Sequence, residues 1–137
     1  MTLSRRNEHP RQALLIGAPH QGNISMHNDV TAMHAALQAR GLGPEEILSL
    51  EGMLDRRILI TFLEGVGRRM AQWRAGELFL YFGGHGFFTG ETVDEARVGV
   101  QLQDAAAGAN GQHVYWEEIF VALSIPTAVT FTMLIDH

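Results

Sequence analysis

Short apolar runs alternate with amphipathic stretches along the chain, and each kind of pattern predicts a different element. A continuous apolar run that ends at glycine or polar residues is typical of a strand buried on both faces. Such runs predict core strands at residues 13–17 and 77–82. Two further core strands are predicted at residues 47–50 and at residues 128–135, the last of which is rich in β-branched residues. Apolar residues that recur every three or four positions predict helices instead. This spacing is found over residues 28–40, 55–73 and 115–123.

The order of these elements predicts the fold class. Strands that alternate with helices form a parallel sheet, and right-handed crossovers place the helices on its two faces. The sequence therefore predicts an α/β fold with a doubly wound, mainly parallel sheet flanked by helices. Asn28 and Asp55 are expected to cap the first two helices. Residues 98–102 carry a weaker strand signal, and residues 87–96 and 104–111 are predicted to be loops.

The pattern predicts a single domain. Residues 1–12 are polar and are expected to form a flexible lead-in, whereas residues 13–137 hold every predicted element. The 137 residues are 46% hydrophobic, which is enough for one buried core. No apolar stretch is as long as a membrane span, and no apolar region follows the polar N-terminus as it would in a secretory signal. We therefore expect a cytoplasmic protein with no membrane partner.

Charge and cysteine content restrict the chemistry. The formal net charge of −5 gives no sign of a phosphate-binding surface, so nucleic acid is not an expected partner. The chain has 0 Cys residues, which excludes disulfides and thiol chemistry within these residues. Any thiol reaction would therefore need a cysteine from another polypeptide segment.

The most informative stretch is LFLYFGGHG, from Leu78 to Gly86. It is an apolar run closed by Gly83 and Gly84, which let the backbone turn sharply, and His85 follows directly. This places His85 at the carboxyl edge of the sheet, where open α/β folds carry out their chemistry. A histidine there is a candidate general base near neutral pH. The alternative is a packed or solvated loop histidine.

Two acidic residues are expected near the same edge. Asp29 follows the first strand and Asp136 ends the fourth, so with His85 they would line one cleft. Two facing carboxylates raise each other's pKa unless a cation lies between them, and an arginine side chain pairs well with carboxylates. The residues therefore indicate a pocket for a basic side chain. The alternative is that Asp29 lies in the first turn of a helix, where the helix dipole favours a negative charge, and that Asp136 caps a turn.

Metal binding is weakly supported. His27 and His34 lie seven residues apart, but no third ligand stands at a suitable spacing for zinc. Calcium prefers oxygen ligands, and one acidic group could supply them, although a solvated loop is the simpler explanation. That group consists of Glu91, Asp94, Glu95 and Asp104. We therefore predict no metal and no cofactor, with calcium as the alternative.

Several segments together resemble a known family, the caspase-like cysteine peptidases, and within it the metacaspase and bacterial orthocaspase branch. The resemblance covers most of residues 13–137 and includes a strand ending in Asp104. Its sequence segments are ALLIG (13–17), HNDVTAM (27–33), GELFLYFGGHG (76–86) and TFTMLIDH (130–137). The resemblance implies a caspase-like catalytic domain, incomplete at its C-terminal end, of which this chain covers about the first four core strands.

The resemblance also implies roles for individual residues. His85 matches the catalytic base, and Gly86 matches a backbone donor of the oxyanion site. Asp29 and Asp136 match the acidic residues that bind Arg or Lys before the scissile bond. Gly83 stands where metacaspases usually have Ser, which removes one polar wall of that pocket.

The resemblance places the nucleophilic cysteine two residues after Asp136, just beyond His137. The expected function is therefore a cysteine endopeptidase that cleaves polypeptides after Arg or Lys, inactive as this Cys-free chain alone. Its expected partner is a C-terminal portion or a small subunit that carries the cysteine. The alternatives are a catalytically inactive caspase-like scaffold or interaction domain, and a flavodoxin-like domain that binds a small ligand.

Overall fold

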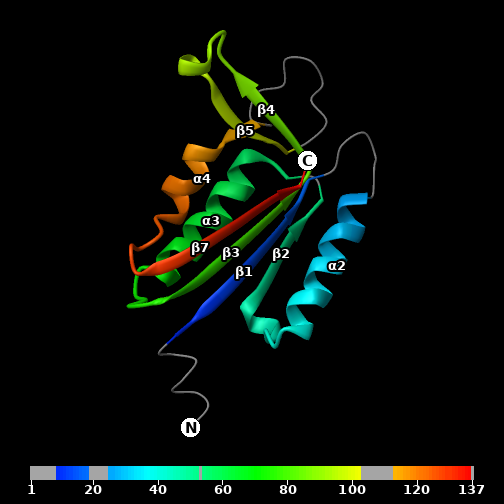
Figure 1. The fold of residues 1–137 in the computed structure, drawn as a ribbon, viewed down its shortest axis with the longest axis vertical. Helices are drawn as coiled ribbons and strands as arrows, with labels where there is room; N and C mark the ends of the chain where they lie inside the picture. The colour runs from blue at the N-terminus through cyan, green and yellow to red at the C-terminus, as the bar shows by residue number, and fades with distance from the viewer. Residues whose placement is uncertain (1–8, 19–24, 53, 103–112, 137) are drawn as a thin grey trace.

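Four parallel strands form the central sheet of the protein. The computed structural model describes residues 9–18, 25–52, 54–102 and 113–136. The sheet has the order β2-β1-β3-β7, and every neighbouring pair is parallel (Figure 1). Its strands are β1 (Arg11–Gly17), β2 (Ile47–Glu51), β3 (Gly76–Gly83) and β7 (Val129–Asp136). All four predicted core strands are present, and the α/β fold class is confirmed.

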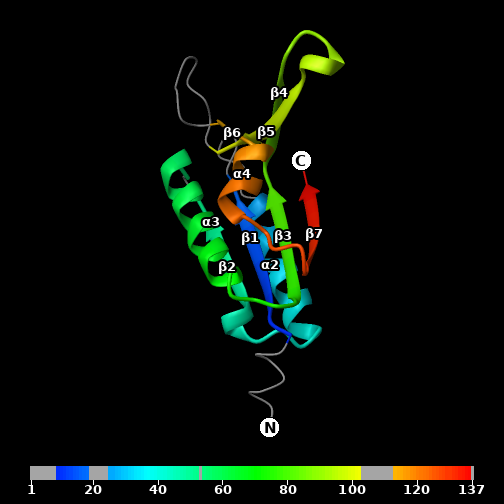
Figure 2. The same cartoon turned by 90° about the vertical axis from the view of Figure 1, so that its left-hand side faces the viewer.

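Helices cover the sheet on both faces, as the sequence predicts. Helix α2 (Ser25–Ala39) packs on one face, while α3 (Arg56–Met70) and α4 (Trp116–Leu123) pack on the other (Figure 2). The alternation of strand side chains explains the two layers, because successive residues of β1 point to opposite faces. Leu14 therefore joins the α3 and α4 layer, whereas Leu15 joins the α2 layer.

A second, antiparallel sheet stands above the carboxyl ends of the parallel strands (Figure 1). It consists of β4 (His85–Thr89), β5 (Arg97–Gln101) and β6 (His113–Tyr115), in the order β4-β5-β6. The predicted strand at 98–102 is thus present as β5. The predicted loop at 87–96 is partly wrong, because its first residues belong to β4.

The contacts of Phe87 explain why β4 forms a strand. Its ring packs against Tyr115, with the ring centroids 5.3 Å apart, and lies over Gly99 on β5. A Cβ at Gly99 would meet Phe87 Cε1 at 2.6 Å, so glycine is what lets the ring approach. These cross-strand contacts depend on pairing that a periodicity pattern does not contain. A short Pro44–Glu46 turn and a Val93–Glu95 turn, both 3₁₀, complete the described elements.

The helix boundaries agree in part with the prediction. Asp55 caps α3, since its Oδ1 accepts the backbone N–H of Ile58 at 2.7 Å. The start expected at Asn28 is wrong, because α2 begins at Ser25. The additional turn packs Met26 against the end of β1, where Gly17 has no side chain and leaves room.

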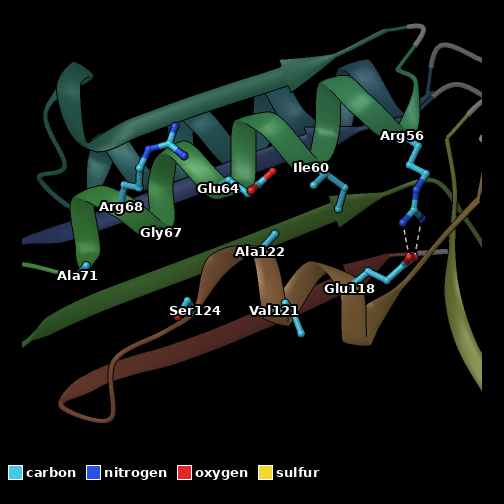
Figure 3. Close-up of a pocket in the computed structure, with 10 residues that line it drawn as sticks. All are labelled: Arg56, Ile60, Glu64, Gly67, Arg68, Ala71, Glu118, Val121, Ala122 and Ser124. Atoms are coloured by element: carbon cyan, nitrogen blue, oxygen red, sulfur yellow. Dashed lines mark hydrogen bonds and ion pairs between the residues drawn. The ribbon is translucent and has the colours of Figure 1, made fainter.

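Helices α3 and α4 approach each other closely at Gly67. A Cβ at this position would lie 2.6 Å from the carbonyl oxygen of Leu123. At the other end of the pair, the guanidinium of Arg56 on α3 donates to both carboxylate oxygens of Glu118 on α4 (Figure 3). A glycine contact and an ion pair thus fix the two helices at opposite ends of their interface.

Candidate functional site

The site begins with the backbone at the carboxyl edge of the parallel sheet. Gly83 on β3 lies between Gly17 on β1 and Asp136 on β7 in the strand register. The ladder continues for one more step on each side. The N–H of Ala18 donates to the carbonyl oxygen of Gly83 at 2.9 Å, and the N–H of Gly84 donates to that of Asp136 at 3.1 Å. The residue directly before His85 is therefore held against Asp136.

Gly84 redirects the chain at this edge. Its φ is +153°, and a Cβ there would meet the carbonyl oxygen of Ala18 at 3.0 Å. The next residue, His85, begins β4 opposite Gln101 of β5 and is exposed to solvent. Gly86 is the second residue of β4 and lies opposite Val100. The edge position of His85 agrees with the sequence pattern, while the roles of His85 and Gly86 stay predictions.

The two acidic residues expected at this edge line one cavity. It has a volume of about 370 Å³ and lies between α2, β3 and β7. Its lining residues are Asp29, Ala32, Met33, Ala36, Tyr81, Leu134, Ile135 and Asp136. Asp29 comes from the second turn of α2 rather than from the first, so the alternative that it lies in the first turn and is favoured by the helix dipole is wrong. Carboxylates above apolar walls suit a cation on an apolar stem.

Tyr81 completes this cavity, although sequence reasoning did not select it. Its hydroxyl donates to Oδ2 of Asp136 at 3.2 Å, and the residue is only 2% exposed. Burial raises the pKa of Tyr81 to about 12, and the negative charges of Asp136 and Asp29 add to the effect. The phenol therefore keeps its proton at neutral pH and remains a hydrogen-bond donor to Asp136.

The location of Tyr81 follows from strand alternation. It packs in the α2 layer with Leu15, whereas Leu80 and Phe82 pack in the opposite layer. A tyrosine inside an apolar run indicates a buried hydrogen bond, because a buried phenol usually has a hydrogen-bond partner. Only the register with β7 identifies that partner as Asp136.

His85 is not among the residues that line the acidic cavity. It belongs instead to the antiparallel sheet, where it lies in the register next to Gln101, which in turn faces His113. The structure thus brings Asp29 and Asp136 together and places His85 beyond them. The backbone bond from Gly84 to Asp136 connects the two parts.

No metal centre is formed within the described residues. His27, from the histidine pair considered for zinc, instead pairs through Nδ1 with Oε2 of Glu51 at 2.7 Å. Across the described parts of the chain, no three His, Asp or Glu side chains converge as metal ligands. Asp104, from the acidic group considered for calcium, lies outside the described residues, so the calcium alternative stays open.

Two other cavities lie away from the predicted site residues. One of about 550 Å³ lies between α3 and α4, and its polar walls include Arg56 and Glu118 (Figure 3). The other, of about 570 Å³, adjoins the acidic cavity along α2 and shares Met33 and Ala36 with it. Neither contains Asp29, His85 or Asp136, so the smaller acidic cavity is the candidate site.

No family model matches this chain, and no curated protein is significantly similar to it. Within the part of the chain that the structure describes, none of the helices has the length and apolar character to cross a bilayer. The assignment of function therefore depends on the geometry at the carboxyl edge of the sheet.

Proposed function

We propose that this chain is the histidine-bearing part of a metacaspase-type cysteine endopeptidase that cleaves after Arg or Lys. The observation that supports the proposal is the acidic cavity, in which Asp29 and Asp136 face the same space. His85 follows Gly84, which is hydrogen-bonded to Asp136, so a candidate base lies beside a pocket for a basic side chain. A base beside a pocket for the basic side chain is one requirement of cleavage after a basic residue.

The proposed reaction uses a cysteine from polypeptide outside these 137 residues, because the chain itself has 0 Cys. His85 takes the thiol proton, and the thiolate attacks the carbonyl carbon of the scissile peptide bond. The N–H of Gly86 stabilises the oxyanion that forms. The imidazolium then gives its proton to the leaving amine, which leaves a thioester. Water, deprotonated by His85, hydrolyses the thioester and regenerates the thiol.

The cavity supplies substrate recognition in this proposal. An arginine or lysine side chain enters between Asp29 and Asp136, with its apolar stem against Ala32 and Met33. The partners are thus a polypeptide substrate and the segment or subunit that carries the cysteine. The proposal includes a cytoplasmic location, where a catalytic thiol stays reduced.

The test combines composition with activity. Denaturing mass spectrometry of native material, with and without iodoacetamide, shows whether a thiol-bearing polypeptide accompanies the chain. Fluorogenic peptides with Arg, Lys or Asp before the scissile bond then give the cleavage specificity. We expect one alkylated cysteine and cleavage after Arg or Lys that is lost in H85A. Native material that carries a reactive cysteine but cleaves none of these peptides would overturn the proposal.

A caspase-like scaffold is the second candidate, and one feature of the antiparallel sheet favours it. Phe88 on β4 and Val98 on β5 are paired across the strands and are 75% and 53% exposed. This pair of adjacent exposed apolar side chains is a candidate contact surface for another protein. If native material contains no thiol and no peptidase activity, this candidate replaces the enzyme.

A further inference from the structure

The side chain of Tyr81 occupies space that Gly83 leaves empty. A Cβ at Gly83 would lie 3.2 Å from the Tyr81 hydroxyl oxygen and 3.3 Å from its Cε1. The phenol therefore extends two residues along β3, across Gly83, and reaches Asp136 on β7. Since Asp136 is the register partner of Gly83, the hydroxyl lies directly at the junction of the two strands. Gly83 thus makes room for the Tyr81 hydroxyl, which comes from two residues earlier on the same strand.

The hydrogen bond has a defined direction. A carboxylate only accepts hydrogen bonds, so Tyr81 must be the donor and Asp136 the acceptor. The donation uses the single phenol proton and leaves the oxygen lone pairs as acceptors. The acidic cavity therefore presents acceptors on three different elements. These are Asp29 on α2, Tyr81 on β3 and Asp136 on β7.

A guanidinium and an ammonium use such a set of acceptors differently. A guanidinium has five N–H donors spread over a planar fork and is weakly hydrated. An ammonium is a compact, strongly hydrated charge with three donors. Acceptors distributed over three walls match the fork, whereas a single compact charge satisfies fewer of them. A set of acceptors on three walls therefore fits the planar fork of a guanidinium better than a single compact charge.

We propose that Tyr81 is a specificity-determining residue of the acidic cavity, and that it makes the cavity prefer an arginine side chain over a lysine side chain. Tyr81 orients Asp136 by donating to it and accepts one N–H of the bound guanidinium. This inference rests on the proposed function only in taking the cavity as the site for a basic side chain. Beyond the proposed function, it states that arginine is the preferred basic side chain and that Tyr81 determines this preference.

The test uses two small cations as side-chain mimics. Propylguanidinium stands for arginine and butylammonium for lysine, and chemical-shift titrations of the labelled 137-residue chain give both affinities. We expect wild type to bind propylguanidinium at least about fivefold more tightly than butylammonium. Loss of one hydrogen bond to a charged group corresponds to about tenfold in affinity. Y81F should therefore lose about tenfold for propylguanidinium and much less for butylammonium.

The second tyrosine of the chain provides a matched control. Tyr115 carries the same phenol, but its hydroxyl lies 3.3 Å from Thr89 Oγ1 in the antiparallel sheet. Y115F should keep both affinities. The chain has 2 Tyr residues, so in that variant Tyr81 is the remaining one and carbon-13 labelling of tyrosine reports on it alone. We expect propylguanidinium to shift the signal of its Cζ, which a purely structural role would not do.

The outcomes separate this inference from the proposed function. If wild type binds neither cation, the acidic cavity is not a site for basic side chains, and both the inference about Tyr81 and the proposed function are overturned. If wild type binds both cations equally, or Y81F loses the same factor for each, the role of Tyr81 is overturned while the cavity stands. If Y81F does not fold, the ratio of the two affinities in wild type and the Cζ signal in Y115F still decide the question.

Discussion

Gly84 donates its backbone N–H to the carbonyl oxygen of Asp136 at 3.1 Å, and this bond joins the two halves of the candidate site. Asp136 lines the acidic cavity between α2, β3 and β7. Gly84 immediately precedes His85, the first residue of the antiparallel sheet. The segment that begins β4 is therefore joined to the wall of the acidic cavity through backbone atoms.

Replacing Asp29 tests the acidic cavity with little risk to the fold. Asp29 is exposed on α2, so D29N should change the free energy of unfolding by less than about 0.5 kcal/mol. It removes one of two carboxylates from the cavity, and we expect affinity for propylguanidinium to fall about three- to tenfold. Titration by NMR measures the affinity, and chemical denaturation measures the stability.

Asp94 provides the control for this change. It is an exposed carboxylate in the Val93–Glu95 turn and does not line the acidic cavity. D94N removes the same charge from the protein and should leave the affinity unchanged. Equal losses in D29N and D94N would mean that net charge, and not the cavity, attracts the cation.

Gly67 and Gly65 form a matched pair within α3. A Cβ at Gly67 would lie 2.6 Å from the Leu123 carbonyl oxygen and 2.8 Å from that of Ala122, both of them backbone atoms. G67A should therefore push α3 and α4 apart and cost about 2 kcal/mol. A Cβ at Gly65 meets only Arg68 Nη2, at 3.8 Å, so G65A should stabilise the helix by about 0.5–1 kcal/mol.

Urea denaturation measures the free energy of unfolding of both variants. The expected gain in G65A is as informative as the expected loss in G67A. A G67A protein with wild-type stability would mean that the α3 and α4 interface tolerates displacement. The close approach of Gly67 to Leu123 would then not hold α3 and α4 at a fixed separation.

The sequence is sufficient to predict the parallel sheet because each of its strands has a local signal, either apolar or β-branched residues, that needs no partner to be recognised. The cap at Asp55 is predictable for the same reason, since its role depends on three neighbouring residues. Strand β4 is not predictable in this way, because its stability comes from Phe87 packing over Gly99 on another strand. Sequence periodicity describes one element at a time, whereas that contact joins two.

The candidate site shows the same limit. Asp29 and Asp136 are recognisable as acidic residues near strand ends, and the structure places both at one cavity. Tyr81 has the pattern of a core position, because it is an aromatic residue between Leu80 and Phe82 in a buried apolar run. Its contact with Asp136 depends on the β3–β7 register, which the sequence does not state.

The ion pair between Arg56 and Glu118 should make stability depend on acid pH. The hydrogen bond from Arg56 is the main cause that lowers the pKa of Glu118, and the backbone N–H of Tyr115 adds to it. A lowered folded-state pKa gives stability that is present above the unfolded value of 4.5 and is lost as pH falls through the folded value. Both side chains are partly exposed, so we expect only about 0.5–1 kcal/mol from the pair.

The variant R56A checks this expectation when its free energy of unfolding is compared with wild type at several pH values. Wild type should exceed R56A in free energy of unfolding by the largest amount near pH 7. This difference should shrink below about pH 4.5, where Glu118 becomes protonated in the unfolded chain. R57A, which removes the neighbouring exposed arginine, should show no such trend. A difference between R56A and wild type that stays constant down to about pH 2 would exclude an electrostatic origin.

Gly99 tests whether the antiparallel sheet positions His85. A Cβ there would clash with the Val114 carbonyl oxygen and would meet the Phe87 ring at 2.6 Å, so G99A must displace β4, β6 or both. Since His85 and Phe87 lie on the same short strand, we expect large backbone shifts at both in NMR spectra, together with a loss of about 1–3 kcal/mol in stability. V98A, at the adjacent exposed position, should leave the shift of His85 unchanged. If the His85 signals are identical in G99A and wild type, the histidine is held by the parallel sheet alone, and β4 has no part in placing the proposed base.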